Sequence, residues 1–559
     1  MPFLAFLLLS GCYLLSGYGL LTIFGLRLRT AYMITLSLLL GIAIASFIPF
    51  LLQLFYIVLT PATVFGSLTL AALLLNIPTL RRIRKEGFSS VRRSFAIPSF
   101  RIMAYEIPYL LILGFFVFVS VWRCYYLPPT SRDVLSGPEA IAEFAVREHT
   151  MINSFFSIDL WSTNNQFKSP FLISLQVICK MAGFPFGQVW LSIVFVSFTV
   201  FLYHALKEKI HPVIAGLLLL LFMMTPEMYA YTFMILYDYS NMVFFFLSLY
   251  FLFQSLSPAS PPPLSPATPP PGSGLDPHPT TRPTPPPATR LIPPPATLAR
   301  RYFYFAGLLM GIATYIRSET LALALLFVPL ILLVQFRLRR SSRQSLQSLA
   351  LTDILFFLPS VLGYYLPTQL YINHYLPAHY DIGGQLNTHL SDLHPLFQRY
   401  GDIVTRLMTG EFAIHLWGYI LYLAAFLFLA ECIFFRRFSR AALNWLYAIV
   451  VLYLGLGALG YLLPLMNLNE TTKRAMFKLF PLVLLYLANN ELLIRLSQRI
   501  SRWEAIPAKL AGSGQTNASR RPASPPKSPS PKPIPIPASP GKTPGSGNSP
   551  RKPNSRKKR

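Results

Sequence analysis

Apolar runs long enough to cross a lipid bilayer recur along the whole 559-residue chain. A helix needs about 20 apolar residues to span a hydrocarbon core of ~30 Å. Hydrophobic residues make up 53% of the chain and charged residues only 12%, about half the charge of a water-soluble protein. We therefore predict an all-α polytopic membrane protein with about 13 transmembrane helices. The expected spans are 3–24, 31–58, 61–80, 107–125, 187–206, 212–226, 235–254, 302–316, 319–336, 350–370, 415–435, 441–465 and 479–496.

The distribution of basic residues predicts how the chain is oriented. Arg and Lys gather in alternate loops, for example in 81–93 and 337–343, and again in the C-terminal tail. Cytoplasmic loops carry such an excess, so we expect the N-terminus outside and the tail in the cytoplasm. Topology explains the net charge of +27 better than nucleic-acid binding does, and we predict no nucleic-acid partner. The tail can touch anionic membrane lipids.

Composition divides the chain into five segments. Residues 1–106 hold three N-terminal spans and a basic loop, and 107–256 hold the first part of a core with a long outer loop at 126–186. Residues 257–298 are Pro-rich and predicted to be disordered, as is the basic Pro-rich tail 498–559. The core resumes in 299–497 with a second outer loop at 371–414. In the first outer loop, 136–149 and 170–183 read as short helices lying along the membrane face.

Ionisable residues next to the spans are the candidates for a functional site. Asp133 and Glu139 lie in the first outer loop, and Asp238 enters a span. Ionised groups at membrane depth are costly unless they are paired or face a wet cavity. Outer-face cations that converge would suit a phosphate group. Snorkelling side chains and a surface ion pair remain an alternative. The further candidates are Lys168, Arg317, Glu319, Lys473 and Arg474.

Metal and nucleotide sites are not predicted. The chain has no HExxH, P-loop or GxGxxG motif, and its four cysteines form no CxxC pair. His374, His379, His389, His394 and His415 are grouped in sequence, but their spacing fits no helical ligand pair. We expect no cofactor, and a requirement for a divalent metal stays open.

Several motifs, taken in order, resemble the membrane glycosyltransferases of GT-C fold. These include the dolichyl-phosphate-mannose protein mannosyltransferases and the lipid A aminoarabinose transferases. The motifs are Lys-Ser-Pro-Phe at 168–171, Asp238 at the head of a span, Gly-Leu-Leu-Met-Gly-Ile-Ala-Thr-Tyr-Ile-Arg at 307–317, and Lys-Arg-Ala-Met-Phe-Lys-Leu-Phe-Pro at 473–481. The sequence departs from the family at Ser169, where a Pro is usual, and in its three extra N-terminal spans.

The resemblance implies transfer of a sugar from a polyprenyl-phosphate donor at the outer face of a cell membrane, and we expect this to be a bacterial inner membrane. Asp133 would be the general base of an inverting reaction. Arg317, Lys473 and Arg474 would bind the lipid phosphate, and Lys168 and Asp238 would orient the sugar or the catalytic loop. Glu139 and Glu319 complete the expected substrate-binding set. The acceptor, whether protein, lipid or glycan, is not implied. A transporter or lipid flippase without glycosyl transfer is the alternative.

Overall fold

The computed structural model describes ten stretches of the chain. These are residues 2–26, 28–86, 102–156, 168–256, 296–342, 346–375, 393–409, 413–435, 438–462 and 473–518. Every regular element in them is helical. The Pro-rich prediction for 257–298 falls almost entirely outside the described residues, as does the tail beyond residue 518.

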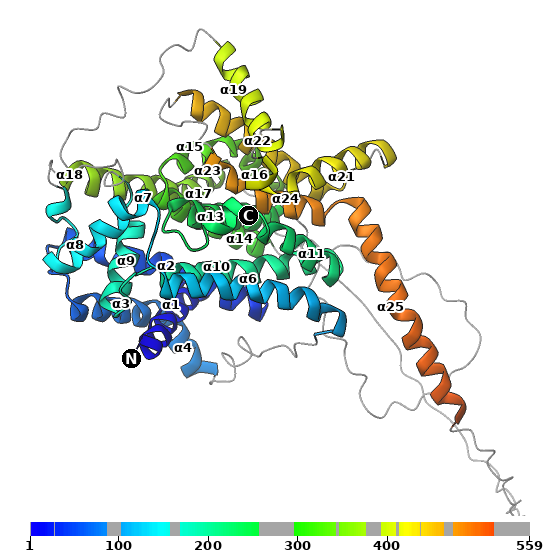
Figure 1. Cartoon of the computed structure of the whole chain (residues 1–559), viewed down its shortest axis with the longest axis horizontal. Coiled ribbons are helices and arrows are strands. Elements are labelled where there is room, and N and C mark those ends of the chain that lie inside the picture. The colour runs from blue at the N-terminus through cyan, green and yellow to red at the C-terminus, as the bar shows by residue number, and fades with distance from the viewer. Residues whose placement is uncertain are drawn as a thin grey trace, which may run out of the picture. The chain divides into compact units, whose positions relative to one another are not determined.

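The elements of the first half alternate long apolar helices with short connecting ones (Figure 1). They are α1 (Pro2–Phe24), α2 (Thr30–Leu54), α3 (Pro61–Leu75), α4 (Ile77–Glu86), η1 (Ala104–Glu106), α6 (Ile107–Tyr126), α7 (Arg132–Val134), η2 (Leu135–Glu139), α8 (Ala140–Glu148), η3 (Ser154–Phe156), α9 (Phe171–Met181), α10 (Val189–Lys207), α11 (Pro212–Met223), α12 (Pro226–Ala230) and α13 (Tyr237–Leu256).

The second half follows the same plan with more broken helices. They are α14 (Ala296–Ile316), α15 (Glu319–Leu326), α16 (Val328–Ser342), α17 (Leu346–Pro367), η6 (Thr368–Ile372), α18 (Asn373–Tyr375), α19 (His394–Val404), η8 (Thr405–Thr409), α20 (Ala413–Trp417), α21 (Ile420–Phe434), α22 (Arg440–Leu462), α23 (Lys473–Ala475), η10 (Met476–Lys478), α24 (Leu479–Ala488) and α25 (Glu491–Ala518).

Six described helices are long and apolar enough to cross a membrane: α1, α2, α6, α10, α13 and α22. The pair α24 and α25 would add a seventh, bent by 55° at Asn489 and Asn490. The chain is therefore a polytopic, membrane-embedded helical protein, as the sequence predicts. Other predicted spans form shorter or divided helices, such as α3, which ends at Leu75, and α15 and α16, which are separated by Phe327. The count of thirteen remains a prediction.

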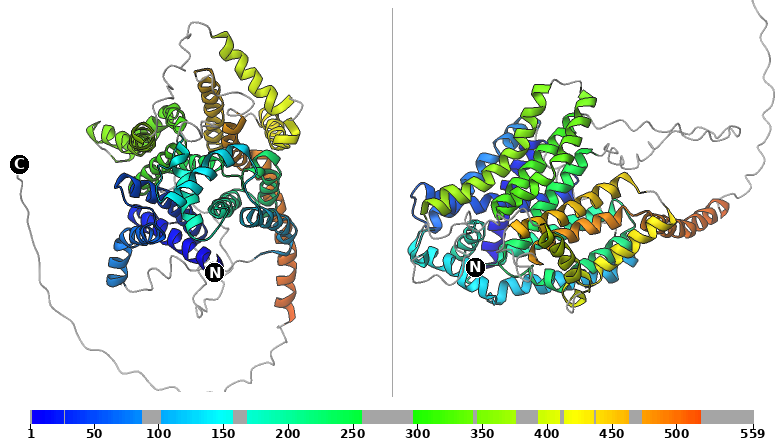
Figure 2. Two further views of the ribbon diagram at one scale, coloured as in Figure 1. Left: turned by 60° about the vertical axis from the view of Figure 1, so that its left-hand side comes forward. Right: turned by 90° about the horizontal axis from the view of Figure 1, so that it is seen from above.

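Glycines let two pairs of helices approach closely. A Cβ on Gly41 of α2 would lie 1.9 Å from the Tyr13 carbonyl oxygen of α1. A Cβ on Gly363 of α17 would lie 2.3 Å from the Gly311 carbonyl oxygen of α14. Small residues at such crossings allow the backbone-to-backbone packing that holds membrane helices together. Helices α14 and α17 consequently run side by side, with α13 against the other face of α14 (Figures 1 and 2).

The first long loop contains the two short helices expected from its sequence. The helix α8 occupies most of 136–149, and α9 occupies most of 170–183. In α9, every residue from Phe171 to Cys179 is buried, because the helix packs against α2 and α8 and touches α14. Near the other end of the chain, α25 continues to Ala518, so a helix extends into the segment 498–559 for which we predicted disorder.

Candidate functional site

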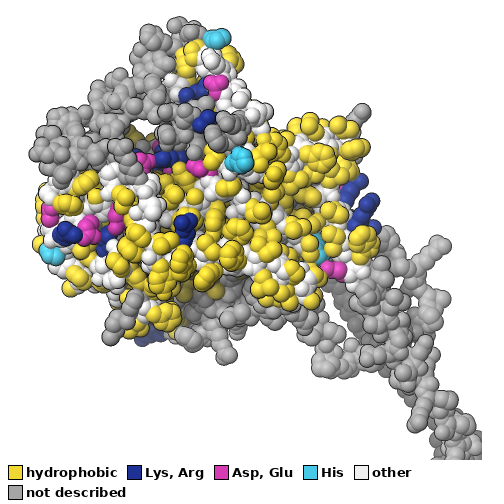
Figure 3. All heavy atoms as spheres, in the orientation of Figure 1, with side chains coloured by type: hydrophobic (Ala, Val, Ile, Leu, Met, Phe, Trp, Pro, Cys, Tyr) yellow, Lys and Arg dark blue, Asp and Glu magenta, His cyan; other side chains and the backbone are white. Residues whose placement is uncertain are grey.

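The candidate site gathers charged residues from five separate segments. Asp133 lies in the short helix α7, and Lys168 lies three residues before the start of α9. Asp238 is in the first turn of α13. Arg317 and Glu319 flank the break between α14 and α15, and Arg474 lies in α23. Figure 3 shows basic and acidic side chains together in this part of the molecule, above a largely apolar surface.

Arg317 links two carboxylates. Its guanidinium pairs with Asp238, whose side chain is only 4% exposed, and its Nε lies 2.6 Å from Glu319 Oε1. Burial opposes the charge on Arg317, but Asp238 and Glu319 outweigh it and raise the Arg317 pKa above its usual value. Asn241 fixes the break between the helices, because its Nδ2 donates to the Ala313 carbonyl (2.7 Å) and to Thr320 Oγ1 (3.0 Å).

Asp133 and Arg474 form the second ion pair of the site. An Arg474 guanidinium nitrogen donates to Asp133 Oδ2 at 2.9 Å, and the Asp133 side chain remains 36% exposed. Burial opposes the charge on Arg474, but Tyr231, Asp238 and Asp133 raise its pKa. Phe477 places this segment by packing edge-on against Tyr231 at 4.6 Å between ring centroids. Asp133 is thus both oriented by a cation and open to solvent.

Lys168 is attached to the same site through Tyr237. The Lys168 ammonium lies 5.7 Å from the centre of the Tyr237 ring, and the Tyr237 hydroxyl donates to the Ser169 carbonyl at 2.8 Å. Although the residue as a whole is exposed, desolvation of the ammonium and the nearby Arg317 charge lower the Lys168 pKa to about 8. Lys168 therefore changes its charge near neutral pH.

Lys478, which precedes the last predicted span together with Lys473 and Arg474, adds a further cation to the site. The residue is 1% exposed, and its Nζ has no hydrogen-bond partner among the described residues. It lies close enough to Glu319, Arg317 and Asp238 to interact with their charges. A buried ammonium without a hydrogen-bonding partner is costly. Its sequence signal was its position four residues after Arg474, which places both side chains on one helical face.

Among the residues of this cluster that the structure describes, cations outnumber carboxylates. Its members are Asp133, Lys168, Asp238, Arg317, Glu319, Arg474 and Lys478. Three negative charges face four positive ones when all are ionised. Guanidinium and ammonium groups that converge in this way suit a phosphate oxygen. The arrangement can therefore hold an anion beside the Asp133 carboxylate, which can accept a proton.

Of the expected site residues, Glu139 stands apart from this cluster in the structure, and the position of the Lys473 side chain is not described. The Glu139 carboxylate lies 2.6 Å from Lys180 Nζ and also accepts a hydrogen bond from Gln176 at 2.7 Å, and Glu143 pairs with the same lysine at 3.0 Å. The Lys473 backbone opens α23, but its side chain lies outside the described part of the structure. Among the described residues, no group of His, Cys, Asp and Glu is arranged to hold a metal ion, and His379 and His389 lie outside them.

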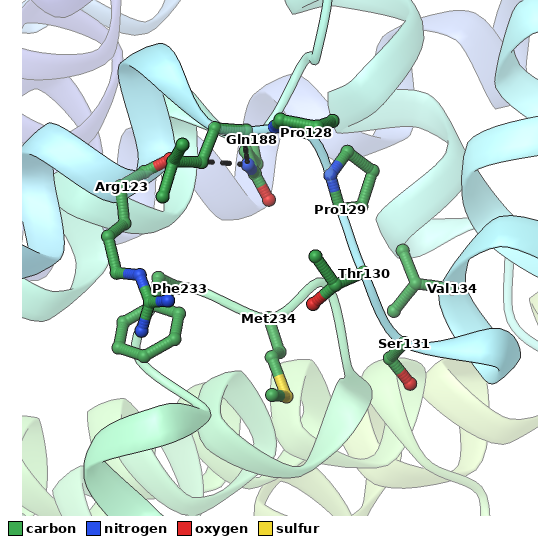
Figure 4. A pocket seen from close by; sticks show the side chains of 10 residues that line it. Arg123, Pro128, Pro129, Thr130, Ser131, Val134, Gln188, Phe233 and Met234 are labelled. Atoms are coloured by element: carbon green, nitrogen blue, oxygen red, sulfur yellow. Dashed lines mark hydrogen bonds between the residues drawn. The ribbon is translucent and has the colours of Figure 1, made fainter.

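A pocket adjoins the loop that carries Asp133 (Figure 4). It encloses about 360 Å³, counting the space open to solvent, and Ser131 and Val134 from this loop line it. Arg123 and Gln188 contribute from α6 and from the residue before α10. Sequence reasoning did not identify this pocket, because its walls come from segments whose proximity depends on tertiary packing.

Comparison with known proteins gives no relative for this chain. No family model, no curated protein and no solved structure matches it.

Proposed function

We propose that this chain is a membrane glycosyltransferase of GT-C type. It transfers a sugar from a polyprenyl-phosphate donor to an acceptor hydroxyl at the outer face of the membrane, with inversion. The observation that carries this proposal is the convergence of surplus cations, including the buried Lys478 ammonium, beside the partly exposed Asp133 carboxylate. The reaction needs cations that bind an anionic leaving group and a general base, and this cluster contains residues suited to both roles.

Asp133 is assigned as the general base. It accepts the proton of the acceptor hydroxyl while that oxygen attacks the anomeric carbon, and the bond from this carbon to the phosphate oxygen breaks. The departing polyprenyl phosphate gains negative charge as the bond breaks. Arg317, Arg474 and Lys478 stabilise this charge, and groups fixed in advance do so without reorganisation. Lys168 and Asp238 orient the sugar, and Lys473 opens the same helix as Arg474.

The proposed topology places this chemistry outside the cytoplasm. Thirteen spans, with the N-terminus outside and the tail inside, would bring the loop 126–186 and the segment that precedes α24 to the same side. The ion pair between Asp133 and Arg474 supports a common side for these two segments. The abundance of Arg and Lys in the alternate loops supports assigning that side to the exterior. The membrane would be a bacterial inner membrane.

A second candidate function is a transporter or lipid flippase. It is favoured by the bend of 55° between α24 and α25. At this break the fully buried Glu431 accepts hydrogen bonds from Asn490 at 2.7 Å and from Tyr486 at 3.1 Å. Interrupted helices with buried polar groups near the membrane midplane form substrate sites in transporters. Each of these Glu431 contacts, however, satisfies groups at the helix break itself.

The deciding experiment is sugar transfer by the purified chain in liposomes, with a panel of radiolabelled polyprenyl-phosphate sugars. We expect Asp133→Asn to lower transfer by about 10²- to 10⁴-fold, the usual contribution of a general base. Asp402→Asn is the matched control, since Asp402 is an exposed acid of α19 and should retain activity. Full activity of a correctly inserted Asp133→Asn protein would remove Asp133 as the base. Flux of the lipid without transfer would support the flippase.

A further inference from the structure

The pocket next to Asp133 has a buried acceptor atom without a hydrogen-bond partner in the described part of the chain. Gln188 is 2% exposed, and its Nε2 donates to the Leu127 carbonyl at 2.6 Å and reaches the Arg123 carbonyl at 3.5 Å. Both partners are acceptors, so the amide nitrogen must face them. The Oε1 atom then points into the hollow (Figure 4), and it has no hydrogen-bond partner among the described residues. Buried polar atoms are normally satisfied, so this atom indicates a hydrogen-bond donor on a ligand.

Arg123 provides a cation at the edge of the same pocket. Its guanidinium carbon lies 4.5 Å from the centre of the Phe233 ring, and the residue is exposed. No carboxylate in the described part of the chain forms an ion pair with it. A guanidinium stacked on a ring keeps its N–H groups at the edge, where they can bind an anionic group in a bidentate manner. The pocket thus offers an anion-binding group and a hydrogen-bond acceptor.

The pocket and the cation cluster share two short segments. Ser131 and Val134 line the pocket, and Asp133 lies between them in the chain and bonds to Arg474. On the facing wall, Phe233 follows closely after Tyr231, whose hydroxyl interacts with Arg474. A molecule in the pocket would therefore lie next to the base of the proposed reaction, while the cluster remains available for a donor phosphate.

We propose that this pocket binds the acceptor substrate, and that the acceptor is a polyhydroxylated compound with an anionic group. Arg123 holds the anionic group, one hydroxyl donates to Gln188 Oε1, and another is presented to Asp133. This inference rests on the proposed glycosyl transfer and specifies its acceptor. The chemistry is that of a glycerol phosphate, which exists both as a lipid head group and as a free metabolite.

Binding to the purified full chain in nanodiscs tests the acceptor site directly. The two probes are glycerol 3-phosphate added to phosphatidylcholine discs, and phosphatidylglycerol incorporated into the discs. We expect Arg123→Gln to weaken binding of the recognised probe by about 10- to 100-fold, as loss of a charge-assisted hydrogen bond would. Gln188→Glu, which places a negative charge in the pocket, should weaken it at least as much. Arg147→Gln is the control, because Arg147 is exposed and pairs with Glu143 on α8.

The outcomes separate the two proposals. Arg123-dependent binding of free glycerol 3-phosphate supports a soluble acceptor, and binding of phosphatidylglycerol alone supports a lipid acceptor. Such binding in a chain that transfers no sugar would retain the site and refute the transferase. If the chain does transfer sugar, Arg123→Gln should raise the acceptor KM more than the donor KM. Wild-type protein that binds both probes no better than Arg123→Gln overturns the acceptor site.

Discussion

Replacing Lys478 with Met should stabilise the free protein and weaken its binding of a phosphate. The Lys478 side chain is 1% exposed, and its Nζ has no hydrogen-bond partner among the described residues. Leaving a buried polar group unsatisfied costs about 1–3 kcal/mol, and Met has a similar shape and volume, so the change leaves little cavity. Loss of the attraction to Asp238 and Glu319 reduces the gain. We therefore expect the free energy of unfolding to rise by about 1 kcal/mol, the lower end of that range.

Lys207→Met is the matched control, with the opposite sign. Lys207 Nζ lies 3.0 Å from Glu106 Oε2, and the Glu106 side chain is only 4% exposed. Removing one partner of a buried ion pair costs about 3–5 kcal/mol. The cost here should be about half of that, because Lys207 is 27% exposed and water screens such pairs. Thermal unfolding in detergent should therefore shift upward for Lys478→Met and downward for Lys207→Met.

The same two variants separate a functional charge from a structural one. Binding of polyprenyl phosphate should weaken by about 10- to 100-fold in Lys478→Met, the effect of losing one charge-assisted hydrogen bond. Lys207→Met should bind polyprenyl phosphate as tightly as the wild type does, at temperatures where the variant is folded. A lower unfolding midpoint for Lys478→Met would show that Lys478 has a structural partner, and would refute its assignment to an anion site.

Three more predictions concern other residues of the site and its surroundings. The Lys168 pKa is lowered to about 8, so its positive charge is present below that pH and lost above it. Donor affinity should therefore fall between pH 7 and pH 9. Lys168→Arg should flatten this pH profile. Tyr237→Phe removes the hydrogen bond to the Ser169 carbonyl and should raise the donor KM by several-fold in steady-state assays, whereas an unchanged KM would show that this bond does not position Lys168. Glu139→Gln should lower the unfolding midpoint, because it weakens the ion pair with Lys180. A loss of sugar transfer in folded Glu139→Gln protein would show instead that Glu139 takes part in substrate binding.

The sequence predicts the membrane class of the fold because hydrophobic length is a local property. The helices α1, α2, α6, α10, α13 and α22 coincide with predicted spans and are long enough to cross. Local chemistry is a weaker guide to where a long apolar run will break. The run 319–336 divides at Phe327, and 479–496 divides at Asn489 and Asn490. At the second break, the buried Glu431 accepts hydrogen bonds from the Asn490 side chain and the Glu491 backbone N–H. The sequence of 479–496 does not predict this partner.

The sequence predicts those site residues that lie at the ends of apolar runs, because an unpaired ionised side chain is costly there. Asp238 and Arg317 stand at the ends of apolar runs, where an ion must find a partner, and they pair with each other in the structure. Glu139 is a candidate only because it is an acid of the first outer loop, and it pairs with Lys180. This pairing depends on how α9 packs against the preceding segment, which hydropathy does not encode. The orientation of the Gln188 amide depends likewise on backbone carbonyls at the end of α6. No sequence motif predicts it.

The ion pairs of this chain differ in whether their charges are balanced, and this difference distinguishes the candidate site from the scaffold. Around Lys180, two carboxylates and the Pro185 carbonyl accept hydrogen bonds from its ammonium, and the Gln176 amide donates to Glu139. Glu106 is likewise matched by Lys207 and Tyr203. The cluster around Arg317 instead retains the buried Lys478 ammonium, which has no hydrogen-bond partner in the part of the chain that the structure describes. A protein stabilised only by packing would gain by replacing that lysine with an apolar residue. Its presence beside Asp238 and Glu319 is the feature of this cluster on which the proposed anion site rests, and the Lys478→Met variant tests it.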